Sequence, residues 1–184
     1  MNKYGYIIPV IMCTAIFNLE ARQSKLDYVS KVFHDGAYIP NAYKESDVIH
    51  RYGEGSKTVD SAGLIRRTYR DTVTGLEVVI TSNPDIASQF RAVDEIRIPS
   101  GNTDKTAPRT IESLEGLKLK GVAIGESTSK AIKAAQDYGA MDTKKEKIRG
   151  REFERVCGFS EGGSNICFFL NGDKVTAMSV GFGP

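Results

Sequence analysis

A Gly-x-Ser-x-Gly pattern is centred on Ser160, with the spacing of a nucleophile elbow that exposes a serine between a strand and a helix. A serine hydrolase of this kind also needs an acid and a histidine later in the chain. The two histidines, His34 and His50, both precede Ser160, and residues 166–170 have the apolar and aromatic character of a strand. We therefore interpret the pattern as a hairpin turn. A small secreted serine hydrolase that uses Ser160 is the alternative function.

Metal and cofactor chemistry finds little support in the residue spacing. Zinc sites need several Cys, His or carboxylate ligands at short spacing, and neither His34 nor His50 has a second histidine one helical turn away. The sequence contains no phosphate-binding Gly-Lys-Ser loop and no dinucleotide-binding fingerprint. We expect no catalysis, no metal and no cofactor.

Two cysteines, Cys157 and Cys167, flank a Gly- and Ser-rich stretch that is typical of a turn. If the hairpin is centred on Gly162, the cysteines lie directly opposite each other on antiparallel strands. Opposed residues bring their Cβ atoms to about 4.5–5.5 Å, and closer at non-hydrogen-bonded pairs, so a disulfide can form. Disulfides persist in oxidising compartments, which favours an exported protein. Two reduced core cysteines are the alternative.

The N-terminus also indicates export. A weakly basic start, residues 1–3, precedes an uncharged apolar stretch over residues 4–17, which resembles the n- and h-regions of a secretory signal peptide. This stretch is shorter than the roughly 20 apolar residues of a membrane span. Cleavage after Ala21 or after Ala15 fits, and we take residues 1–21 as the signal peptide. A buried N-terminal strand or helix is the alternative. We expect a periplasmic or secreted protein with no stable membrane span after cleavage.

The overall composition, 40% hydrophobic and 26% charged residues, is that of an ordinary globular protein. A net charge of +2 is too small to indicate nucleic-acid binding. Basic residues gather between Lys144 and Arg155, but Glu146, Glu152 and Glu154 dilute them. We interpret this run as a solvated loop, and we expect the partner to be another protein rather than a nucleic acid.

A short sequence pattern that occurs twice predicts the helices and strands around these residues. Glu45-Ser46 opens a helical stretch that Tyr52-Gly53 closes, and Glu126-Ser127 opens another that Tyr138-Gly139 closes. Ser46, and either Ser127 or Ser129, are candidate N-caps. The strand-like runs lie at residues 63–70, 76–81 and 93–99, and again at 151–159, 166–170 and 174–182. We therefore predict an α+β fold of two tandem repeats, each a short helix followed by an antiparallel three-stranded meander. The expected divisions are signal peptide 1–21, entry segment 22–42, first repeat 43–100, linker 101–116 and second repeat 117–184.

The last three predicted strands carry apolar residues on both faces. By alternation, one face holds Phe153, Arg155, Cys157, Phe159, Cys167, Phe169, Thr176, Met178 and Val180. The other holds Val156, Ile166, Phe168, Leu170, Val175 and Ala177. An antiparallel sheet with one wet face alternates apolar and polar residues, so the first face is either a binding surface or a core between the repeats. Aromatic residues and Arg are enriched in binding hot spots. The candidate binding residues are Phe153, Arg155, Phe159, Phe169 and Met178.

The segments Ile124-Gly125-Glu126-Ser127 with Tyr138-Gly139, and Glu45-Ser46 with Tyr52-Gly53, resemble the repeat unit of β-lactamase-inhibitory-protein-like folds. Small envelope lipoproteins of the BamE/SmpA type share this general plan. The resemblance covers residues 43–183 as a tandem pair, although the first copy lacks the glycine before its Glu-Ser and two-helix units are not clearly present. It implies an exported protein-binding module without catalysis, such as an inhibitor, immunity factor or envelope accessory protein. A small-ligand carrier is a further alternative.

Overall fold

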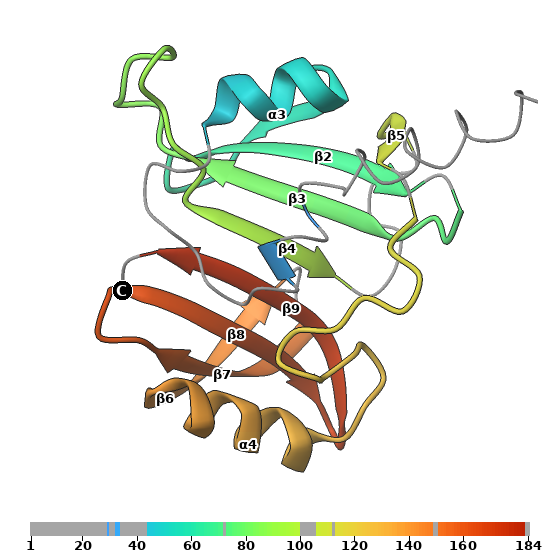
Figure 1. Cartoon of the computed structure of the whole chain (residues 1–184), viewed down its shortest axis with the longest axis vertical. Helices are drawn as coiled ribbons and strands as arrows, with labels where there is room; N and C mark the ends of the chain where they lie inside the picture. Colours follow the sequence, from blue (N-terminus) through green and yellow to red (C-terminus); the bar gives the residue numbers. More distant parts are fainter. Residues whose placement is uncertain are drawn as a thin grey trace, which may run out of the picture.

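The structure is a computed structural model that describes residues 29, 32–33, 44–71, 73–99, 106–111, 113–148 and 151–182 (Figure 1). Its elements are α3 (Glu45–Tyr52), β1 (Ser56–Val59), β2 (Ile65–Asp71), β3 (Glu77–Ser82), β4 (Glu95–Pro99), β5 (Arg109–Ile111), α4 (Thr128–Tyr138), β6 (Ala140–Ile148), β7 (Arg151–Phe159), β8 (Ser164–Asn171) and β9 (Lys174–Phe182). The strands form one sheet in the order β1-β2-β3-β4-β9-β8-β7-β6, antiparallel throughout, and β5 pairs in parallel with β2.

This single sheet corrects the predicted fold class. β4 pairs with β9 along its whole length, with Ile96 opposite Val180 and Ile98 opposite Met178. Strands from both halves of the chain therefore share one sheet, and the prediction of two tandem repeats with separate three-stranded meanders is wrong. The fold is mainly antiparallel β, with α3 and α4 as its named helices among the described residues.

The six predicted strands are present as β2, β3, β4, β7, β8 and β9, but β1, β5 and β6 were missed, and β5 lies within the predicted linker 101–116. In the basic run, Lys144, Lys145 and Lys147 lie on β6 and Arg155 lies on β7, so the prediction of a solvated loop is wrong. The two strands pair from Ala140 opposite Phe159 to Ile148 opposite Arg151. β6 ends the sheet, and its side chains from Ala140 to Lys145 are exposed. An edge strand with charged side chains lacks the apolar alternation that reveals a strand in sequence.

Both named helices pack against the same side of the sheet, which we call the helix face. Strand register places Tyr69, Ile80, Ile96, Val180, Phe168 and Val156 on this face. Val48 and Tyr52 of α3 and Ala131 and Ala135 of α4 join the same buried cluster. The helical residues Val29, Val32 and Phe33 belong to it as well. Figure 1 shows α3 beside β2 and α4 beside β7, at opposite ends of the molecule.

A buried cluster of charges fixes the start of α3 to the sheet. The Glu45 carboxylate accepts hydrogen bonds from Arg67 Nε at 2.8 Å, Arg91 Nη1 at 2.7 Å and Ser82 Oγ at 3.1 Å. Burial alone raises the pKa of Glu45, but these hydrogen bonds outweigh it and hold the pKa below its ordinary value. Ser46 is not the N-cap that the sequence suggests: Lys44 occupies that position, and no side chain caps the helix.

Helix α4 lies close to β7 because small residues meet there. Ala131, Ala134 and Ala135 are its buried residues. Gly158 of β7 faces this helix, and a Cβ at that position would lie 2.2 Å from the carbonyl oxygen of Ala135. Ser127 is the N-cap residue, as one of the two predicted candidates, although its hydroxyl contacts the hydroxyl of Ser129 rather than capping the backbone.

The predicted signal peptide and most of the entry segment lie outside the described residues. In the part of the chain that the structure describes, no helix is both long enough and apolar enough to cross a membrane.

Candidate protein-binding face

The side of the sheet opposite the helix face is centred on a disulfide, and we call it the disulfide face. Cys157 of β7 lies opposite Cys167 of β8, and the same row continues through Ser179 of β9 to Arg97 of β4. The two sulfur atoms are 2.02 Å apart and the two Cα atoms 4.1 Å apart. The predicted pairing of the two cysteines is confirmed, because the hairpin turn between β7 and β8 brings them into register.

The centre of this face is apolar and buried. Cys157, Cys167, Phe169 and Ala177 form a small cluster, and Phe159 packs against it. Phe169, one of the candidate binding residues, is only 1% exposed. Phe169 therefore packs beneath the surface residues of this face, and it cannot contact a partner unless those residues move.

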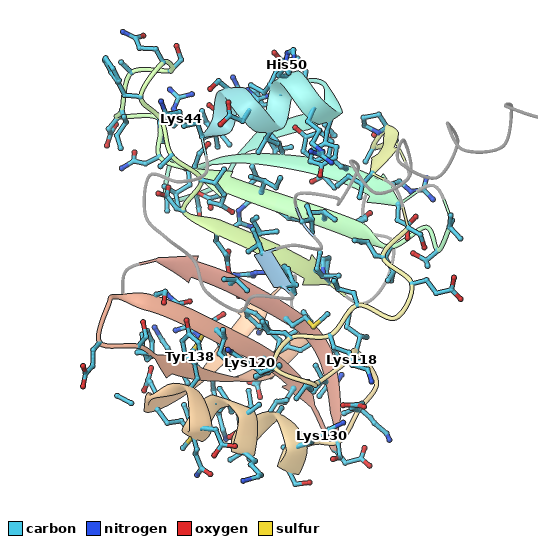
Figure 2. All side chains as sticks on the ribbon, viewed as in Figure 1. Lys44, His50, Lys118, Lys120, Lys130 and Tyr138 are labelled. Atoms are coloured by element: carbon cyan, nitrogen blue, oxygen red, sulfur yellow. A yellow bond between two sulfur atoms is a disulfide. The ribbon has the colours of Figure 1, made fainter. Side chains whose placement is uncertain are left out.

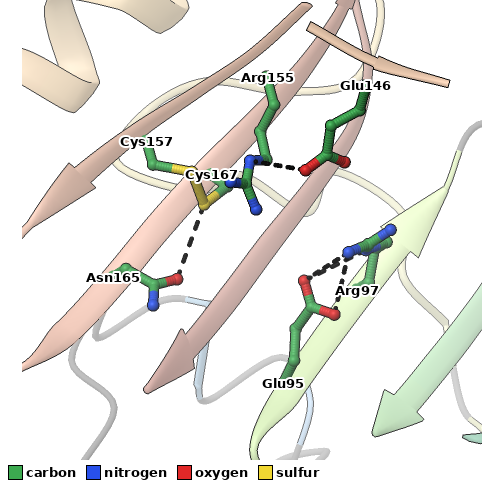
Figure 3. Close-up of a disulfide and its surroundings, with 7 residues drawn as sticks. All are labelled: Glu95, Arg97, Glu146, Arg155, Cys157, Asn165 and Cys167. Carbon is green, nitrogen blue, oxygen red and sulfur yellow. Dashed lines mark hydrogen bonds and ion pairs between the residues drawn. A yellow bond between two sulfur atoms is a disulfide. The ribbon is translucent and has the colours of Figure 1, made fainter. Parts of the chain in front are cut away.

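On the disulfide face, two arginine side chains each form an ion pair with a nearby carboxylate (Figure 3). The guanidinium carbon of Arg97 lies 4.4 Å from the ring centroid of Phe169, and Arg97 Nη2 donates to both Glu95 oxygens at 2.9 and 3.1 Å. Arg155 Nε lies 3.1 Å from Glu146 Oε1. A guanidinium stacked on an aromatic ring is favourable, and the ion pairs restrict both side chains further. The charged part of this face is thus ordered.

The exposed part of the predicted site lies along β7. Phe153, Arg155 and Phe159 alternate with helix-face residues, so all three stand on the disulfide face, and each is partly exposed. At a rise of about 3.3 Å per residue, the strand separates the two phenylalanines by roughly 20 Å. These three residues form a strip that a partner can reach.

Met178 does not belong to the disulfide face, so its predicted placement there is wrong. Leu170 pairs with Val175 and Phe169 pairs with Ala177, which leaves Thr176 as an extra residue in β9. This bulge shifts the alternation by one residue. Met178 and Val180 consequently face the core on the helix face, whereas Ala177 lies beside the disulfide.

Ser160 lies in the turn between β7 and β8, as the hairpin interpretation predicted. Its hydroxyl is 2.7 Å from Ser164 Oγ, which in turn is 2.7 Å from the hydroxyl of Tyr138. The Tyr138 ring has Lys120 Nζ at 5.4 Å from its centroid (Figure 2). The strand β8 follows this turn instead of a helix. These hydrogen bonds tie the turn to α4 and engage the Ser160 hydroxyl.

Metal-binding groups are not assembled in the described part of the chain. Among those residues, no group of three His, Cys, Asp or Glu side chains lies close enough to hold a metal ion. His50 is exposed near the end of α3, and His34 lies outside the described residues.

Comparisons with known proteins found no match for this chain: no family model matches it, and neither does any curated protein or solved structure. The resemblance to the inhibitory-protein and envelope-lipoprotein repeat folds therefore remains a prediction from the sequence motifs.

Proposed function

We propose that this chain is an exported protein-binding module without catalysis of its own, acting as an inhibitor, immunity factor or envelope accessory protein. The observation that carries the proposal is the strip of partly exposed Phe153, Arg155 and Phe159 on a face stiffened by a disulfide.

Export is supported by the Cys157–Cys167 disulfide together with the signal-like N-terminus. Cytosolic thiols are kept reduced, so a structural disulfide of this kind is typical of periplasmic and extracellular proteins. The sequence of residues 1–21 has the charge and apolar pattern of a signal peptide. Two independent features thus favour the same compartment.

Binding is supported by the kind of side chains on the strip and by the contacts that hold Arg155 and Phe159 in place. Aromatic residues and Arg dominate binding hot spots, where they enter desolvated pockets of the partner. Arg155 is already paired with Glu146, and Phe159 packs on the disulfide cluster. Side chains that are ordered before binding lose less conformational entropy when the complex forms.

A serine hydrolase through Ser160 has weaker support. The Ser160 hydroxyl is engaged with Ser164, and the β7–β8 turn leads into a strand. A nucleophile elbow instead needs a strand, a turn and a helix, with a histidine base placed beside the serine.

The proposal is tested by capture from a cell-envelope extract with the tagged mature protein. The double variant Phe153→Ala/Phe159→Ala removes both rings of the strip. Met141→Ala is the matched control, because Met141 is 45% exposed but lies on β6 opposite Gly158, toward the helix face. Quantitative mass spectrometry is expected to show one partner retained by wild type and by the control and lost from the double variant. Thermal denaturation of all three proteins shows whether the folds are equivalent, and a partner retained equally by all three would refute the proposed surface.

A further inference from the structure

The outer edge of β6 is a row of backbone groups that pair with no described residue. β6 is the last strand of the sheet and is nine residues long, whereas β1, the strand at the other end, has four. The side chains from Ala140 to Lys145 are exposed, so α4 does not cover this edge. Unpaired N–H and C=O groups along a sheet edge are a template for pairing with a further strand.

The cysteine pair on the neighbouring strands shows which backbone groups of β6 point outward. The Cα atoms of Cys157 and Cys167 are 4.1 Å apart. This distance fits a non-hydrogen-bonded antiparallel pair, at about 4.5 Å, rather than a hydrogen-bonded one, at about 5.5 Å. Cys157 therefore turns its N–H and C=O toward β6, where it pairs with Asp142. Because these directions alternate along a strand, the odd-numbered residues from Met141 to Lys147 turn theirs to the outer edge.

The charges of β6 select one register for pairing with a second copy of the same strand. Outward-facing backbone groups hydrogen-bond only with outward-facing ones, so the two-fold axis passes through one residue position, and that residue lies opposite its own copy. From Asp142 to Lys147, Thr143 is the only uncharged residue. An axis at any other position of this stretch brings a charged side chain directly opposite itself, which is destabilising.

The register centred on Thr143 also brings opposite charges together. It sets Asp142 opposite Lys144 of the second copy, and the symmetry repeats this pair on the other side of the axis. Both side chains are exposed, and neither forms an ion pair with a described residue of its own chain. Opposite charges that face each other stabilise an antiparallel pair. The order Asp-Thr-Lys is thus self-complementary, which a seam between identical copies requires and an unrelated strand does not.

We infer that β6 pairs antiparallel with β6 of a second copy, with Thr143 at the two-fold axis, so that the two sheets become one. The seam is a single strand pair, and interfaces below about 1,200 Å² are typical of weak association, so we expect a dissociation constant of about 10–100 μM. The axis that relates two antiparallel strands is perpendicular to their sheet, so both disulfide faces lie on the same side. The inference does not rest on the proposed function, because the seam uses a backbone edge and leaves the strip on β7 free.

Sedimentation velocity on the purified exported protein, from about 5 to 500 μM, tests the seam. Asp142→Lys and Lys144→Asp each place like charges opposite each other at two symmetric positions, whereas the double exchange Asp142→Lys/Lys144→Asp restores opposite charges. We expect each single variant to weaken dimerisation at least about tenfold, and the double variant to return within about threefold of wild type. Asp137→Lys is the matched control, because it makes the same change of charge at an exposed site on α4 and should dimerise like wild type.

Cysteine cross-linking tests the register. A residue on the axis lies opposite itself with Cβ atoms about 4.5–5.5 Å apart, where small adjustments allow a disulfide. Thr143→Cys should therefore form an interchain disulfide under mild oxidation. The two copies of Lys145→Cys would lie four residues apart along the seam, at about 13 Å, and should yield at most about a tenth as much cross-linked dimer.

Four results would overturn the inference. They are a monomer at every concentration, a dimer that Asp142→Lys leaves unchanged, a double exchange that does not restore dimerisation, and equal cross-linking of Thr143→Cys and Lys145→Cys. If Thr143→Cys cross-links in envelope extract to a different protein while the purified chain stays monomeric, the edge of β6 accepts a strand of that protein instead of a second copy.

Discussion

Replacing Glu45 by Gln should destabilise the attachment of α3 to the sheet. We expect it to lower the free energy of unfolding more than the equivalent change at any other ion-paired carboxylate among the described residues. The Glu45 side chain is 3% exposed and bonds two arginines. Gln keeps nearly the same shape and one acceptor oxygen, but it removes the charge that compensates Arg67 and Arg91. Arg67 is also buried, and only the exposed Glu54 carboxylate would remain to pair with it.

The expected loss is set by the cost of leaving a buried charge without its partner. Breaking a buried ion pair from one side typically destabilises a protein by about 3–5 kcal/mol. Because Gln still accepts one hydrogen bond, we expect the free energy of unfolding to fall by about 3 kcal/mol. The matched control is Asp137→Asn, which breaks the exposed Lys133–Asp137 pair on α4 and should change the free energy by less than about 0.5 kcal/mol.

Urea denaturation at neutral and acid pH is the assay. The pKa of Glu45 is lowered in the folded protein, so its stabilising contribution is complete above the ordinary value of 4.5. Below that pH the unfolded chain takes up the proton first, and the contribution is lost as pH falls further toward the folded-state pKa. The difference in free energy of unfolding between wild type and Glu45→Gln should therefore become smaller in acid. A difference below about 0.5 kcal/mol at pH 7, or one that does not change in acid, would refute the assigned role of this carboxylate.

Three further predictions concern the second half of the chain. Reducing the disulfide should lower the free energy of unfolding by about 2–3 kcal/mol, measured by urea denaturation with and without reductant, and two alkylatable thiols in the untreated exported protein would contradict the pairing. Gly158→Ala should destabilise by about 2–4 kcal/mol, because the added Cβ would lie 2.2 Å from a backbone oxygen of α4, whereas Gly162→Ala has its nearest neighbour at 3.8 Å and should be close to neutral. Ser160→Ala should leave turnover unchanged on a panel of ester and peptide substrates, and loss of a wild-type activity in this variant would favour the hydrolase alternative.

Local patterns made part of this structure predictable from the sequence. The Gly-rich turn between Cys157 and Cys167 fixes the register of β7 and β8, so the disulfide follows from a short-range feature. The apolar alternation in β2, β3 and β7 likewise identifies these strands. Phe153, Arg155 and Phe159 share a face for the same reason, because the side chains of one strand alternate with period two.

Long-range pairing and local irregularity were not predictable. The sequence contains no signal that pairs Ile96 with Val180, because such pairing depends on the packing of segments far apart in the chain. The bulge at Thr176 reverses the face of Met178, and alternation cannot reveal an inserted residue. Glu45, Arg67 and Arg91 come together only in the fold, so their cluster could not be recognised from residue types.

The central claim, that the strip on the disulfide face binds a protein, is tested most directly by calorimetric titration of the purified envelope partner. Wild type and Phe153→Ala/Phe159→Ala are compared in the oxidised state, with Met141→Ala as control. Loss of two hot-spot rings should weaken binding by at least about 2 kcal/mol, close to thirtyfold in the dissociation constant, while the control binds like wild type. Equal affinity for all three proteins would contradict the claim.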